Sequence, residues 1–227
     1  MSLEVGRRWL GLVAWSLGAL ACSSGTASDP IVLGGGAGGA GAPADEPKAF
    51  ASPRAVVRFK GGERLRNDYA AALALDPGEV CNELGRLSCV DEVHRVALGG
   101  VDAYVAQVFL PAPSTGATTP LAVERMALSA CVERSRRDFA APDRAVLWSG
   151  LEVDAAGNLN DPDGAAAREA IARLYRRALG RESSGLERER LSSFYAAVRE
   201  QRPAGAAEVW ATLACFAALT TTEALFF

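Results

Sequence analysis

The chain has 227 residues with a formal net charge of −3, and its only lysines are Lys48 and Lys60. Nucleic-acid binding requires clustered Lys and Arg side chains that neutralise phosphates, so this mildly acidic composition argues against a nucleic-acid partner. About 175 residues follow the N-terminal leader and linker, which is enough for one domain with a hydrophobic core or for two small domains.

The first 21 residues have the pattern of a bacterial lipoprotein signal peptide. Arg7 and Arg8 precede an apolar run over 9–21, which ends in small residues directly before Cys22. The run is shorter than the ~20 residues that a bilayer-spanning helix needs. We expect residues 1–21 to be removed and Cys22 to be acylated, for example with palmitate, so that the membrane is a partner through the lipid anchor.

The same pattern predicts where the protein resides. A multiply acylated cysteine gives stable membrane attachment. With Ser23 directly after Cys22, the chain resembles bacterial lipoproteins that are sorted to the outer membrane. We therefore expect a cell-envelope protein that faces the periplasm or the cell surface. A plain secretory signal is the alternative, because Ala19-Leu20-Ala21 also fits an Ala-x-Ala cleavage site.

Residues 22–52 are predicted to be a lipidated cysteine followed by a flexible tether. Ser, Gly, Ala and Pro dominate this segment, and such a composition buries too little apolar surface to offset chain entropy. Gly34, Gly36 and Gly39 match the G-x-G-x-x-G pattern of dinucleotide-binding loops. Because prolines follow where that motif needs a helix, we expect no nucleotide site here.

Residues 53–160 are predicted to form the helical N-terminal part of the globular region. The expected elements are a helix over 63–75, a second helix that begins at Asp76-Pro77 and ends near Leu87, and a long helix from Thr119 to Phe139. The apolar segment 101–110 fits either a helix or a strand, and 111–118 is a loop. A short hairpin or irregular segment is expected near 145–158, where turn-forming residues separate short apolar pieces.

Residues 161–227 are predicted to form a C-terminal three-helix unit. The first helix should begin at Asp161-Pro162 and end at Gly180. A capping box at Ser184-Gly185-Leu186-Glu187 opens the second helix, and the third carries Trp210. Amphipathic helices with short links predict a mainly α fold, a compact helical bundle.

Four cysteines follow Cys22, and an exported protein resides where disulfides form. Three pairings are possible. We favour Cys81–Cys89, which closes a short local loop, and Cys131–Cys215, which staples two distant helices. Four buried free thiols are the alternative.

The C-terminal part carries a resemblance to known bacterial modules. Residues 174–181 read Leu-Tyr-Arg-Arg-Ala-Leu-Gly-Arg, and Trp210 and Thr222-Glu223-Ala224-Leu225-Phe226 follow them. This pattern resembles planctomycete-type domains of unknown function that accompany c-type cytochrome domains on secreted proteins. The whole mature chain resembles uncharacterised lipoproteins of the myxobacterial type. These families have no assigned catalytic residue, and the resemblance implies at most an accessory role in a cytochrome-linked secreted complex.

The sequence offers no recognisable catalytic, metal or cofactor site. His94 is the only histidine, and the chain has neither the Cys-x-x-Cys-His motif of c-type haem attachment nor a Gly-x-Ser-x-Gly nucleophile turn. The acidic stretch 154–163 lacks the ligand spacing of a calcium loop, and carboxylates beside arginines are interpreted as solvated surface. We therefore expect no cofactor and a lipid-anchored, non-catalytic interaction or accessory protein. The alternatives are an accessory subunit of a cytochrome-linked complex or a hydrolase with an unrecognised site.

Overall fold

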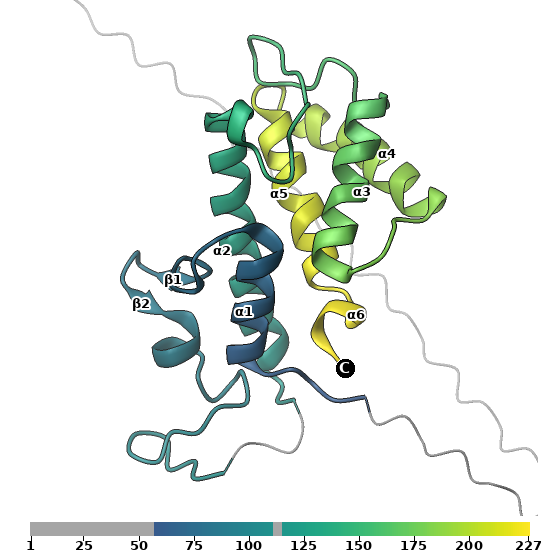
Figure 1. Ribbon diagram of the computed structural model, residues 1–227. Helices are drawn as coiled ribbons and strands as arrows, with labels where there is room; N and C mark the ends of the chain where they lie inside the picture. The colour runs from purple at the N-terminus through teal and green to yellow at the C-terminus, as the bar shows by residue number, and fades with distance from the viewer. Residues whose placement is uncertain (1–56, 111–114) are drawn as a thin grey trace, which may run out of the picture. The chain divides into compact units, whose positions relative to one another are not determined.

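The computed structural model describes residues 57–110 and 115–227. The predicted signal peptide, the lipidation site Cys22, the tether and the glycine motif at 34–39 therefore lie outside the described residues. Within the described part the chain is mainly helical, with one small antiparallel sheet (Figure 1). This confirms the predicted fold class.

Six α-helices account for most of the described residues. They are α1 (Gly62–Leu73), α2 (Thr119–Ala140), α3 (Ala165–Leu179), α4 (Gly185–Gln201), α5 (Ala206–Leu219) and α6 (Thr222–Leu225). A two-stranded hairpin and three short helical turns connect them. These are β1 (Asn82–Glu83) and β2 (Leu87–Ser88), with turns at Pro77–Glu79, Cys89–Val93 and Pro142–Arg144.

Helix α5 lies at the centre of the bundle. It packs against α2, α3 and α4, and Figure 1 shows it between α2 on one side and α3 on the other. Glu208 is its only charged residue, and a helix that is apolar on nearly all sides is stable only when other elements surround it. The indole of Trp210 is fully buried, with the rings of Trp148 and Tyr195 centred 5.5 and 6.1 Å away. These aromatic contacts fix the packing of α5.

The segments 53–160 and 161–227, predicted as separate parts, share one hydrophobic core. The contact between α2 and α5 is the most extensive between any two elements of the described chain. A disulfide between Cys131 on α2 and Cys215 on α5 joins them, with Cα atoms 5.7 Å apart. The long central helix and the C-terminal helices therefore stabilise one another.

Capping residues set the helix boundaries of the C-terminal third, as the sequence predicted. Gly180 ends α3 with a positive φ of 68°, a conformation that glycine adopts without steric cost. Ser184 accepts a hydrogen bond from the backbone N–H of Glu187, whose carboxylate accepts one from the N–H of Ser184 at 2.6 Å. This reciprocal pair is the predicted capping box, and it begins α4.

The predicted second helix, from Asp76-Pro77 to Leu87, is wrong. The cap at Asp76 begins only one short turn, and the chain then reverses through β1 and β2, with Leu84 and Gly85 at positive φ. The disulfide between Cys81 and Cys89 requires this reversal. Its Cα atoms lie 5.5 Å apart, whereas an α-helix would separate residues at this spacing by about 12 Å.

Two further segments refine the sequence-based expectations. Helix α3 begins at Ala165 rather than at Asp161-Pro162, because those residues form a separate turn closed by a 3.3 Å hydrogen bond from the Gly164 N–H to the Asp161 carbonyl. Residues 101–110 form neither of the regular elements considered. They form a loop with one isolated bridge. The irregular segment expected near 145–158 is present and ends in a single bridge to residue 159.

Candidate contact surface

The loop between Gly100 and α2 carries several large apolar side chains in solvent. Tyr104 is 98% exposed, Val105 87%, Phe109 71% and Leu110 78%. Scattered apolar residues are normal on a protein surface, but several large exposed ones within ten residues of one loop make that loop a candidate interaction site. We name residues 101–110 the exposed apolar loop.

Hydrogen bonds close the backbone of this loop. Asp102 and Val108 exchange two backbone hydrogen bonds, of 2.9 and 2.8 Å, and the Asp102 carboxylate accepts a third from the Val105 N–H at 3.0 Å. The only charged side chain of the loop is thus already engaged. These bonds satisfy polar groups within the loop itself and leave the apolar side chains free to contact a partner.

The chain just before the loop is tied to the starts of α1 and α2. The Gly62 N–H donates to the Leu98 carbonyl at 2.9 Å, and the Thr119 hydroxyl donates to the Ala97 carbonyl at 2.6 Å. A Cβ atom at position 62 would come within 2.7 Å of the Leu98 Cβ, so the close approach requires glycine. Figure 1 shows the loop beyond the N-terminal end of α1.

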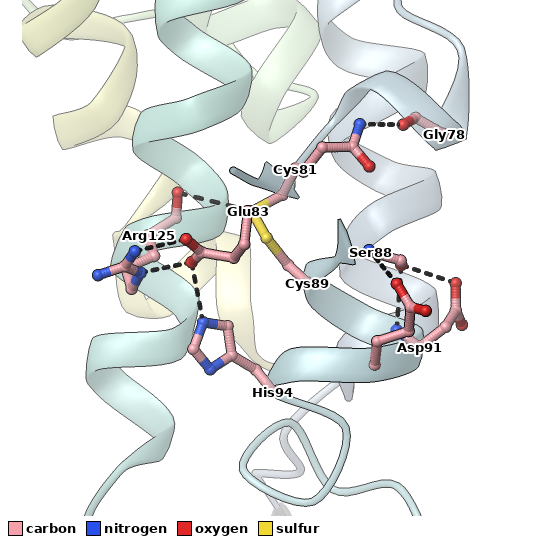
Figure 2. The surroundings of a disulfide bond; sticks show 10 residues. Gly78, Cys81, Glu83, Ser88, Cys89, Asp91, His94 and Arg125 are labelled. Atoms are coloured by element: carbon pink, nitrogen blue, oxygen red, sulfur yellow. Dashed lines mark hydrogen bonds and ion pairs between the residues drawn. A yellow bond between two sulfur atoms is a disulfide. The ribbon is translucent and has the colours of Figure 1, made fainter. Parts of the chain in front are cut away.

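The one histidine of the chain follows the Cys89–Val93 turn and lies beside the hairpin and α2 (Figure 2). The Cys81–Cys89 disulfide closes the hairpin, and the carboxylate of Glu83 lies between Arg125 on α2 and His94. Arg125 donates two hydrogen bonds of 2.6 Å to this carboxylate, and His94 Nε2 lies 3.2 Å from its Oε1. The cluster therefore fastens the hairpin to α2.

The electrostatics of this cluster also bear on catalysis. The hydrogen bonds from Arg125 lower the pKa of Glu83 below its ordinary value, so the carboxylate is ionised and accepts from both neighbours. Among the described residues no hydroxyl or thiol is hydrogen-bonded to His94, whose only side-chain partner there is Glu83. A nucleophile activated by histidine needs such a contact. The arrangement fits a structural role for His94 at the end of the Cys89–Val93 turn.

The interpretation of the charged residues as solvated surface is wrong for Arg134 and Asp138. Both are buried and form a 2.7 Å ion pair within α2. The Asp138 carboxylate also accepts backbone N–H groups of residues 146, 147 and 148 at 2.7 to 3.0 Å. It thus fixes the segment that carries Trp148, whose indole N–H donates to Ser135 at 3.2 Å. This network therefore joins α2 to the segment 146–148 within the core.

In the acidic turn at 154–158, the carboxylate oxygens of Asp154 accept hydrogen bonds from the turn itself. The carboxylate of Asp154 accepts the N–H groups of Ala156 and Asn158, both at 2.8 Å, and these bonds hold its pKa below the ordinary value. In the parts 57–110 and 115–227, no three His, Cys, Asp or Glu side chains are arranged to hold a metal ion. The turn leads toward α5, since Asn158 contacts Pro203 and Ala206.

A second, smaller apolar surface lies in a shallow hollow between the hairpin and α2. Leu128 and Val132 line it and are about half exposed. Ion pairs from Arg137 to Glu79 and Glu133, of 2.7 and 2.6 Å, border the hollow. These charges limit its apolar area, so the exposed apolar loop is the stronger candidate surface.

The four predicted disulfide cysteines are paired as the sequence favoured. Cys81 pairs with Cys89 and Cys131 with Cys215, and three of the four side chains are fully buried. Sequence reasoning did not find the exposure of the apolar loop, because an apolar run of this length ordinarily predicts burial. The flanking residues do indicate a surface loop, because Gly99-Gly100 precedes the segment and a stretch rich in Pro, Ser and Thr follows it.

Comparisons with known proteins give no relative from which a function could be inferred. No family model, no curated protein and no solved structure matches the chain. No helix in the described part of the chain combines the length and apolar character needed to cross a bilayer.

Proposed function

We propose that the protein is a lipid-anchored, non-catalytic contact or accessory protein of the bacterial cell envelope, held at the outer membrane through Cys22. The observation that carries this proposal is the exposed apolar loop. The polar clusters described above, around Glu83, Asp138 and Asp154, all have structural roles. A domain that acts by contact needs a solvent-exposed apolar surface more than it needs a reactive group.

Three features of the chain support this role. The basic and apolar leader ends at Cys22, and a segment rich in Gly, Ala and Pro separates this cysteine from the folded domain. Two disulfides staple the domain, which suits an oxidising compartment outside the cytoplasm. The only histidine is bound to a carboxylate that already pairs with Arg125. The described residues add no observation in favour of the cytochrome-linked or hydrolytic alternatives.

Metabolic labelling tests the anchor directly. Cells that express the full chain are grown with labelled palmitate, and the parent is compared with Cys22→Ala. We expect the parent to carry label and fractionate with membranes, and the variant to carry none. Ser24→Ala, two residues further on, is the matched control and should label like the parent. Equal labelling of the parent and Cys22→Ala would overturn the proposal.

A further inference from the structure

The exposed apolar loop has the composition of a membrane-interface segment. Its ten residues include Tyr104 and Phe109, and its only charged residue is Asp102. Aromatic side chains with apolar neighbours are favoured at the boundary between lipid headgroups and acyl chains. The Asp102 carboxylate is already bonded to the Val105 N–H, so the loop presents no charge that lacks a hydrogen bond within the loop.

A protein partner is held in register by polar groups as well as by an apolar centre. Protein interfaces surround an apolar centre with polar groups that fix the register of the two partners. The exposed apolar loop offers no further ionic group for this purpose between Val101 and Leu110. Its internal backbone bonds between Asp102 and Val108 also reduce the cost of placing the loop in a less polar medium.

The position of the loop in the domain also favours a membrane. The chain just before it, at Ala97 and Leu98, is hydrogen-bonded to Thr119 at the start of α2 and to Gly62 at the start of α1. Phe59 forms a bridge with Phe226, and the Lys60 N–H donates to the Leu225 carbonyl, so the chain enters α1 from beside α6, at the same end of the domain as the loop (Figure 1). A Gly-rich random coil with as many residues as separate Cys22 from Val57 has a root-mean-square span of about 30 Å. A bilayer that held the lipid would therefore be within reach of the loop at high effective concentration.

We propose that the exposed apolar loop lies in the headgroup region of the bilayer that holds acylated Cys22. This inference rests on the proposed function for the anchor and names the partner of the contact surface. The lipid and the loop are then two contacts with one membrane, and the second contact fixes the orientation of the domain.

A vesicle assay separates the loop from the anchor. The chain from residue 22 onward is prepared with Cys22→Ser, so that it bears no lipid, and is sedimented with vesicles of phosphatidylethanolamine and phosphatidylglycerol. We expect measurable partitioning of this chain. Replacing Tyr104 and Phe109 together by serine should lower the partition coefficient at least about tenfold, since each buried aromatic side chain contributes strongly to transfer from water.

Leu84→Ser is the matched control. Leu84 is an equally exposed apolar residue on the hairpin turn, outside the exposed apolar loop, and its replacement should leave partitioning unchanged. Near-ultraviolet circular dichroism confirms that all variants are folded. An equal loss of partitioning in Leu84→Ser would indicate unspecific adhesion and overturn the proposal.

A second measurement locates the loop. Tyr104→Trp adds an exposed indole to a mature chain whose native tryptophans, Trp148 and Trp210, are buried. Lipids brominated near the headgroup should quench the fluorescence of this indole and not that of the parent. Absence of both quenching and partitioning overturns the proposal, even where palmitate labelling of Cys22 succeeds. In that case a protein that co-purifies with the parent and not with the serine variant is the occupant of the loop.

Discussion

At the scale of single residues, Asp138 does the most to define the interior. Its carboxylate accepts hydrogen bonds from three consecutive backbone N–H groups and pairs with Arg134, all inside the core. A buried charge is tolerated only when hydrogen bonds and an opposite charge replace its hydration. Asp138 therefore holds the N–H groups of segment 146–148, while Arg173 donates to the Leu147 carbonyl from the other side, and together they position the indole of Trp148 that packs on Trp210.

Asp138→Asn is expected to lower the free energy of unfolding by about 3 kcal/mol. The amide removes the negative charge, leaves Arg134 buried without a counter-ion and replaces one acceptor oxygen by a donor. Urea unfolding monitored by tryptophan fluorescence measures the loss. Asp143→Asn is the control, because Asp143 lies exposed in the neighbouring turn and should change stability by less than about 0.5 kcal/mol. A loss at Asp138 as small as at Asp143 would contradict the structural role of the network.

At the scale of elements, sequence reasoning succeeded where the signal is local. Gly180 and the Ser184–Glu187 box define the turn between α3 and α4 through backbone conformation and hydrogen bonds within a few residues. The cap at Asp76 is equally local, but a cap does not determine how long the helix that follows it will be. Here the Cys81–Cys89 disulfide holds the chain in a hairpin, so the expected helix is only one short turn. Whether residues 101–110 are buried or exposed depends on tertiary packing, which periodicity does not report.

The capping box of α4 also makes a pH-dependent contribution. Hydrogen bonds from Arg181, with those from Ser184, lower the pKa of Glu187 from its ordinary 4.5 to about 2. A lowered pKa in the folded state means that the stabilisation is present above pH 4.5 and is lost as the pH falls toward 2. We expect the difference in unfolding free energy between the parent and Glu187→Gln to shrink over this window.

The expected size of this effect is modest, below about 1 kcal/mol, because both partners are partly solvent-exposed and water screens the pair. Glutamine retains the capping geometry, so the variant isolates the charge. Urea unfolding at a series of pH values measures the difference. Glu189→Gln, exposed on the same helix and without an ion pair in the described residues, should parallel the parent throughout. A constant difference between parent and Glu187→Gln would show that its charge does not contribute.

At the scale of the whole molecule, two disulfides of very different span stabilise one domain. Cys131–Cys215 closes a loop with a sequence separation of 84 and joins α2 to the central α5, whereas Cys81–Cys89 has a separation of 8 and fastens only the hairpin. In the chain-entropy description, a longer closed loop restricts the unfolded chain more strongly. The long-range bridge should therefore carry most of the stabilisation, and the local one should mainly preserve the hairpin and its contact with α2.

Replacing each pair by alanine tests this division. We expect loss of Cys131–Cys215 to lower the free energy of unfolding by about 4 to 5 kcal/mol and loss of Cys81–Cys89 by about 2 to 3 kcal/mol. In a domain of this size each kcal/mol lowers the melting temperature by about 2 to 4 °C, so calorimetry resolves the two variants. Reductant should lower the melting temperature of the parent and leave the variant without both bridges unchanged. Equal losses from the two pairs would show that local strain or packing at the hairpin, rather than the span of the closed loop, sets the stabilisation.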